Sequence, residues 1–113
     1  MLDLNTVLDE KYYDIKLLDG KILHLDRPSQ AMIENTLVVD KVADSGNTEG
    51  TVKALAILFM RILNRNNEGI KFEYNELTEV YSFEVMGYVI EDYFNFWNLD
   101  SNNKVNFQKD QQA

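Results

Sequence analysis

His24 is the only histidine of the chain, and it is the first candidate for acid–base chemistry because imidazole changes its charge near neutral pH. A transition-metal site would need further histidine or cysteine ligands, and the sequence has neither. In the β-hairpin predicted below, His24 points to the more polar face. We therefore interpret it as an exposed or partly covered strand residue, and we expect no metal site and no cofactor.

Two polar segments partly match ligand-binding motifs, but each departs from its motif at essential positions. Residues 46–51 lack the glycine spacing and the lysine of a phosphate-binding loop, and Glu49 would repel a phosphate. Asp100 opens a segment like a calcium loop, but Val105 stands where the turn glycine belongs and Gln111 replaces the closing glutamate. Neither segment predicts a ligand site.

Paired carboxylates and serines complete the set of candidates for catalysis. Glu76 with Glu79, or Glu91 with Asp92, could in principle share acid and base roles, but a solvated helix face explains both pairs better. No serine lies in a Gly-x-Ser-x-Gly nucleophile elbow. The sequence therefore predicts a protein that is not an enzyme.

The composition describes one small acidic domain. The chain has 113 residues, of which 45% are apolar, and its formal net charge is −8, which argues against nucleic-acid binding and for neutral or basic protein partners. The longest apolar run, residues 54–60, is too short for a membrane span, and the N-terminal residues lack the features of a signal peptide. We expect a soluble intracellular protein with a single domain over residues 1–99 and a polar flexible tail over residues 100–113.

Residues 12–25 predict a β-hairpin whose register can be derived. With a three-residue loop that ends in Gly20 at positive φ, Ile15 lies opposite Leu23 and Tyr13 opposite Leu25. The apolar side chains of both strands then share one face, whereas a two-residue turn would divide them between the two faces. Because an isolated hairpin is marginally stable in water, this face must pack on other elements.

Two helices are predicted next, at about residues 28–43 and 51–65. Asp26 or Ser29 can cap the first helix, with Pro28 in its first turn. Residues 44–50 are predicted as a loop, and Gly69 as a C-terminal cap of the second helix. The second helix is apolar on nearly all sides, which predicts a central helix or one covered by another chain. Its main apolar side is predicted to comprise Val52, Leu55, Phe59, Ile62 and Leu63.

Two further helices are predicted at about residues 75–81 and 83–98, after a short extended piece at 70–74. Asn75 and Ser82 are their predicted caps. The fold class is α+β and mainly α, with the N-terminal hairpin packed on a small bundle of three to four helices.

The segment from Phe72 to Asn103 combines negative charge with aromatic side chains. It contains seven carboxylates, nine of the thirteen aromatic residues and no lysine or arginine. Such a surface suits a basic or amphipathic partner segment, although an aromatic stripe on a helix more often faces the interior. The predicted core positions are Phe83, Met86, Ile90 and Phe94. The candidate partner-binding residues, for which core and interface remain equally open, are Tyr88, Tyr93, Phe96 and Trp97.

The order of these features is similar to that of a known family. The hairpin sequence Tyr13-Asp14-Ile15-Lys16-Leu17 with Asp19-Gly20-Lys21, the Pro28-Ser29 helix start, the apolar helix ending in Ile62-Leu63-Asn64 and the Tyr- and Phe-rich last helix resemble the tail assembly chaperones of long-tailed bacteriophages. The resemblance covers about residues 12–97. Its motifs are hydrophobic patterns rather than ligand residues.

The resemblance implies a non-catalytic role in the cytoplasm of a bacterial host. Proteins of this family bind the tape measure protein and help to recruit major tail tube protein subunits, and they are not expected in the mature virion. Many have a longer form made by translational frameshift, which a protein sequence cannot show. A homo-oligomer is possible. Two alternatives stay open: a structural head-to-tail connector or tail-completion subunit, and a small acidic inhibitor of a basic protein surface.

Overall fold

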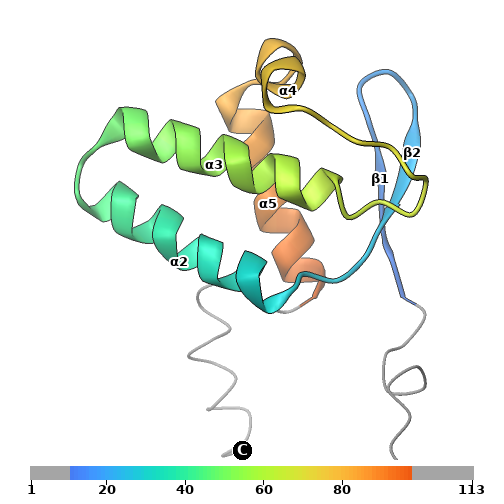
Figure 1. The fold of residues 1–113 in the computed structure, drawn as a ribbon, viewed down its shortest axis with the longest axis horizontal. Coiled ribbons are helices and arrows are strands. Elements are labelled where there is room, and N and C mark those ends of the chain that lie inside the picture. The colour runs from blue at the N-terminus through green and yellow to red at the C-terminus, as the bar shows by residue number, and fades with distance from the viewer. Residues whose placement is uncertain (1–10, 98–113) are drawn as a thin grey trace, which may run out of the picture.

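The computed structural model describes residues 11–97, in which a two-stranded antiparallel hairpin precedes four helices (Figure 1). The strands are β1 (Tyr13–Lys16) and β2 (Ile22–Leu25). The helices are α2 (Gln30–Asp44), α3 (Thr48–Leu63), α4 (Tyr74–Val80) and α5 (Phe83–Phe96). The predicted α+β, mainly α class is confirmed. The predicted tail at 100–113 lies outside the described residues.

The hairpin has the predicted register. Ile15 pairs with Leu23 and Tyr13 with Leu25, and the Leu17 amide donates to the Lys21 carbonyl at 2.8 Å across a three-residue loop. Gly20 has a φ of +89°, a region that glycine enters without steric cost, so the loop can close in this form. The shared apolar face lies against the helices, and its Leu23 and Leu25 are fully buried.

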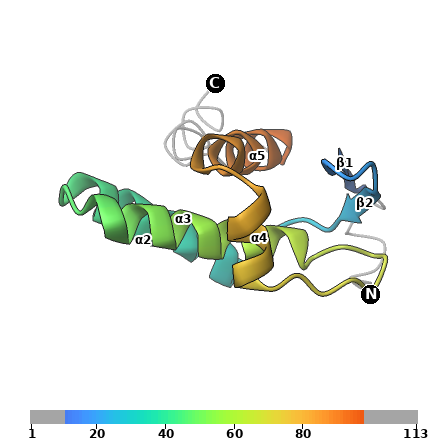
Figure 2. The same ribbon diagram turned by 90° about the horizontal axis from the view of Figure 1, so that it is seen from above.

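Helix α3 is central, as its apolar pattern predicted. It contacts α2, α4, α5 and β2. Figure 1 and Figure 2 show α2 and α3 in one layer, α5 on one side of this layer, and the hairpin beside α5. The buried side chains of α3 are Ala56, Leu58, Phe59, Ile62 and Leu63.

The connection between α2 and α3 is shorter than predicted. Asn47 caps α3, because its side-chain oxygen accepts a 2.9 Å hydrogen bond from the Gly50 amide, and the helix therefore starts at Thr48. Gly50 is thus helical rather than part of a loop. A Cβ at this position would lie 3.0 Å from Val42 Cγ1, so the glycine allows α2 and α3 to approach closely.

The other helix boundaries shift by up to about two residues. Ser29 caps α2, which leaves Pro28 just before the cap instead of inside the first turn. Glu73 precedes α4 in place of Asn75, and its amide donates to Glu76 Oε1 at 2.7 Å. Ser82 caps α5 as predicted.

The predicted end of the second helix is wrong. Helix α3 stops at Leu63 with Asn64 as its cap, whereas Gly69, although at positive φ, lies in the following loop. Residues 70–73, part of the extended piece predicted at 70–74, belong to no helix or strand, and Tyr74 already starts α4. The side chain of Asn64 instead binds the backbone of Phe72 in both directions, accepting from its amide at 2.6 Å and donating to its carbonyl at 3.1 Å.

One predicted core residue, Phe83, lies at the surface and is 44% exposed. Val52, on the predicted main apolar side of α3, is 42% exposed. Met86 and Phe94 are buried as predicted, and Ile90 packs against the core while partly exposed.

Candidate partner-binding surface

The candidate surface is the solvent-exposed side of α5, and its C-terminal end borders the hairpin. At about 3.6 residues per turn, the exposed residues that follow Phe83 fall on one continuous face, which we call the α5 outer face. It comprises Glu84, Val85, Tyr88, Glu91, Asp92, Asn95 and Phe96. Three of these seven are carboxylates, and neither α4 nor α5 contains a lysine or arginine.

Tyr88 is the most exposed large apolar side chain of the described residues, at 78%. Glu84 lies one turn before it and Glu91 one turn after it, so two carboxylates flank the ring along the helix. An exposed aromatic ring between carboxylates can contact the apolar part of a partner while the charges attract its lysines or arginines.

Tyr93, by contrast, is a core residue, and its assignment to a partner-binding surface is wrong. Its side chain is fully buried, and its hydroxyl donates to the Asp26 carbonyl at 2.5 Å. Burial raises its pKa well above the ordinary value, so the phenol stays neutral and remains a donor. The residue therefore ties α5 to the connection between β2 and α2.

Phe96 and Trp97 form an aromatic corner with Tyr13 and Tyr93. The rings of Phe96 and Trp97 meet edge to face at 4.8 Å, and Tyr13 meets Phe96 at 5.3 Å. Lys11 Nζ lies 4.6 Å from the Phe96 ring centre. Phe96 is 37% exposed and Trp97 is partly buried, so both side chains pack mainly within the domain.

Cations cover much of this corner. Besides Lys11, the guanidinium of Arg27 lies 5.1 Å from the Trp97 ring centre. Such contacts favour a cation over an aromatic face and occupy the surface that a partner would use. Of the four predicted partner-binding residues, only Tyr88 has a side chain that is mostly exposed to solvent.

Asp92 connects the α5 outer face to the hairpin. The Tyr13 hydroxyl donates to Asp92 Oδ2 at 2.5 Å. Burial, and secondarily this carboxylate, raise the pKa of Tyr13 above its ordinary value. The bond fixes the side of α5 that faces the hairpin, and thereby the direction in which Tyr88 projects.

A shallow apolar hollow of about 410 Å³ lies near the start of α5, where sequence reasoning expected core. Phe83 and Val52 line it together with Ala43 of α2, Gly46 of the turn, and Thr48 and Thr51 of α3. Neither Phe83 nor Val52 was predicted as a surface contact. Their positions within the first turns of their helices were the available signal, because helix ends are often less covered than helix centres.

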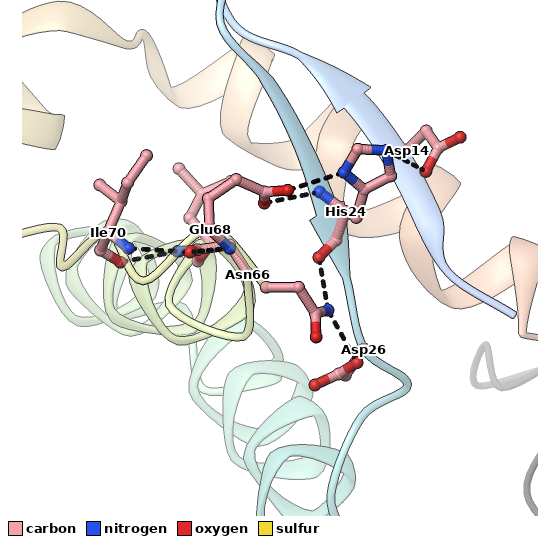
Figure 3. A network of polar contacts seen from close by, with 8 residues as sticks. Asp14, His24, Asp26, Asn66, Glu68 and Ile70 are labelled. Carbon is pink, nitrogen blue, oxygen red and sulfur yellow. Dashed lines mark hydrogen bonds and ion pairs between the residues drawn. The ribbon is translucent and has the colours of Figure 1, made fainter. Parts of the chain in front are cut away.

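His24 forms a polar cluster on the outer side of the hairpin (Figure 3). Its Nδ1 lies 2.7 Å from Glu68 Oε2 and its Nε2 lies 3.7 Å from Asp14 Oδ1. The hydrogen bond to Glu68 and the two nearby carboxylates raise the pKa of His24, and the bonds from His24 lower the pKa of Glu68. The structure thus places His24 on the polar face, as predicted, with a structural partner in the loop after α3.

Within residues 11–97, no group of three or more His, Asp or Glu side chains is arranged to hold a metal ion. None of the helices in that range is long and apolar enough to cross a bilayer.

No family model, curated protein or solved structure matches the chain. Its function is therefore inferred from the physical character of the α5 outer face and from the family resemblance described above.

Proposed function

We propose that this protein is a non-catalytic tail assembly chaperone of a long-tailed bacteriophage that binds the tape measure protein through the α5 outer face. The observation that carries the binding role is Tyr88, an exposed aromatic ring held between Glu84 and Glu91 on a rigid helix. A client helix with an apolar stripe and flanking lysines or arginines is complementary to this arrangement.

The identity of the client rests on the family resemblance. A tape measure protein is long and largely helical, and its apolar stretches need cover before the tail tube surrounds it. The acidic surroundings of Tyr88 keep such a complex soluble, since excess charge of one sign opposes further association. Recruitment of tail tube subunits, action in the host cytoplasm and absence from the finished virion are parts of the same proposal.

The test is co-expression of the chain with the tape measure protein of the same phage. We expect a higher soluble yield of the tape measure protein and co-elution of both proteins on size exclusion. Tyr88→Ala should reduce co-elution while leaving the urea midpoint of the isolated protein unchanged. Leu37→Ala is the matched control, because it removes another exposed apolar side chain, from α2, away from the α5 outer face.

Two outcomes would contradict the proposal. If the wild-type chain neither co-elutes with the tape measure protein nor raises its yield, the chaperone role is wrong. If mass spectrometry finds the chain in ring stoichiometry in purified virions, a connector or tail-completion subunit is the better assignment.

A further inference from the structure

The two edges of the hairpin differ in how their backbone groups are used. The outer edge of β2 is occupied by the loop after α3: the His24 amide donates to Glu68 Oε1 at 2.9 Å, and the His24 carbonyl accepts from the Asn67 amide at 2.9 Å. The Asp26 amide donates to the Arg65 carbonyl at 3.0 Å. Residues 65–68 therefore close this edge.

Within the described part of the chain, no backbone hydrogen bond closes the outer edge of β1 in this way. In an antiparallel pair, bonded and non-bonded residue pairs alternate. His24 turns its backbone groups outward, so its cross-strand partner Asp14 also turns outward, and Lys16 follows two residues later. Among residues 11–97, the backbone groups of Asp14 and Lys16 have no hydrogen-bond partner outside the hairpin. We call these groups the open edge of β1.

We propose that the open edge of β1 pairs antiparallel with the same edge of a second copy of this chain, with Ile15 on the two-fold axis. This arrangement gives a continuous four-stranded sheet, which is more stable than a two-stranded one. It satisfies the outward backbone groups of Asp14 and Lys16 in both copies. The apolar faces of the two hairpins lie on the same side of the new sheet, because the side-chain alternation is preserved.

Charge along the edge selects this register and this occupant. With Ile15 on the axis, Asp14 lies opposite Lys16 of the second copy, and the symmetry repeats the pair, so two opposite-charge pairs form. An axis at residue 14 would place two aspartates opposite each other, and an axis at residue 16 would do the same with two lysines. Like charges directly opposite in a sheet are destabilising, whereas opposite charges stabilise it.

The apolar residues that flank the open edge fit the same register. Tyr12 is 43% exposed and Leu18 is 69% exposed in the single chain. An axis at Ile15 brings the Tyr12 side chain of one copy toward the Leu18 side chain of the other; the Leu18 backbone is already hydrogen-bonded to the Tyr81 side chain, so the new backbone ladder is limited to Asp14 and Lys16. Both exposed side chains then gain cover, which no pairing centred elsewhere on β1 provides for both.

The experiment is sedimentation of the full chain over a range of concentrations at about 0.15 M salt, where the long-range repulsion between two acidic chains is screened. We expect a reversible monomer–dimer equilibrium. Lys16→Glu and Asp14→Lys should each weaken dimerisation by at least about tenfold, because each turns two attractive pairs into repulsive ones. The double swap Asp14→Lys with Lys16→Asp should restore the dimer. Lys53→Glu, an exposed charge reversal on α3, is the matched control and should change little.

A cysteine at the axis tests the register directly, since the natural chain has no cysteine. Residues facing each other at a non-bonded antiparallel pair have Cα atoms about 4.5 Å apart, which is within disulfide range. Ile15→Cys should therefore form disulfide-linked dimers on mild oxidation, and Lys53→Cys should not.

Three results would overturn the proposal. A wild-type chain that stays monomeric up to roughly 1 mM has no significant self-pairing. A dimer that forms but is indifferent to the charge reversals and is not restored by the swap uses another surface. A dimer in which Ile15→Cys crosslinks no faster than Lys53→Cys has another register. None of these results depends on the tape measure protein, so the dimer and the chaperone role can fail separately.

Discussion

The hydroxyl of Tyr93 provides the sharpest test of the tertiary structure, because a single oxygen atom can be removed from a buried ring. Tyr93→Phe keeps the ring and its edge-to-face contact with Tyr13 at 5.5 Å. It removes the 2.5 Å hydrogen bond to the Asp26 carbonyl. The loss therefore concerns the bond to the Asp26 carbonyl and a contact with the Arg65 side chain, and it leaves no cavity larger than an oxygen atom.

The expected cost combines the lost hydrogen bond with the carbonyl left without its partner. A neutral intramolecular hydrogen bond contributes about 0.5–1.5 kcal/mol net, and a buried group left without its partner costs about 1–3 kcal/mol. Because Asp26 is partly exposed and water can reach part of it, we expect a decrease of about 1–2 kcal/mol in the free energy of unfolding. For a domain of this size, each kcal/mol corresponds to about 4–8 °C in Tm.

The assay is urea unfolding followed by circular dichroism, with Tyr88→Phe as the matched control. Tyr88 lies on the same helix but is 78% exposed, so loss of its hydroxyl should leave the urea midpoint unchanged. The raised pKa of Tyr93 means that the phenol remains protonated, so the difference between Tyr93→Phe and wild type should stay constant between about pH 6 and 9. An unchanged midpoint for Tyr93→Phe, or an equal loss for Tyr88→Phe, would refute the assignment of Tyr93 to the core.

Two further predictions concern the hairpin. The pKa of His24 is raised, so the stability it contributes is fully present below the ordinary pKa of 6.5 and is lost as the pH rises through the raised pKa. The pKa of Glu68 is lowered, so the stability it contributes is present above the ordinary pKa of 4.5 and is lost as the pH falls through the lowered pKa. The difference in unfolding free energy between wild type and His24→Gln, measured in urea, should thus be largest between pH 4.5 and pH 6.5 and should shrink at higher pH. A difference that grows above pH 8 would contradict the His24–Glu68 contact. Gly20→Val should lower the free energy of unfolding by about 1–2 kcal/mol, because the backbone φ of +89° at position 20 strains a β-branched side chain even though nothing lies within 4 Å of an added Cβ. Gly20→Asn should lower it less, because asparagine tolerates positive φ better. Equal urea midpoints for Gly20→Val and wild type would show that the loop does not need a positive φ.

Local chemistry was sufficient to predict the hairpin and two of the four helix N-caps, Ser29 (as one of two alternatives) and Ser82. The turn at Gly20 and the alternation of apolar residues fixed the register, because a shift of one residue would have turned an apolar strand face to water. Ser29 and Ser82 cap their helices because a short hydroxyl side chain can accept from the amide three residues ahead. The Asn47 cap was missed because the two nearby glycines at 46 and 50 are also typical of a loop.

The candidate site could be predicted only in part. A charged and aromatic surface on the last helix followed from composition, but Tyr88 and Tyr93 could not be separated by residue type. Both are tyrosines on a helix that is apolar around much of its circumference, and the local pattern allows either to face outward. Which one is exposed depends on where α3 and the hairpin cover α5.

What the sequence by itself determined, then, was the set of elements, their approximate limits and the acidic, aromatic character of the last helix. Those properties depend on residues near one another in the chain. Only the tertiary structure decided that Tyr93 is held inside by the Asp26 carbonyl, that the Tyr88 side chain is exposed, and that the loop at 65–68 closes the outer edge of β2, whereas no residue of 11–97 bonds to the backbone at the outer edge of β1. The contacts of Tyr93 and of the 65–68 loop join residues about 40 to 70 positions apart, and packing between distant segments is not encoded in any local period.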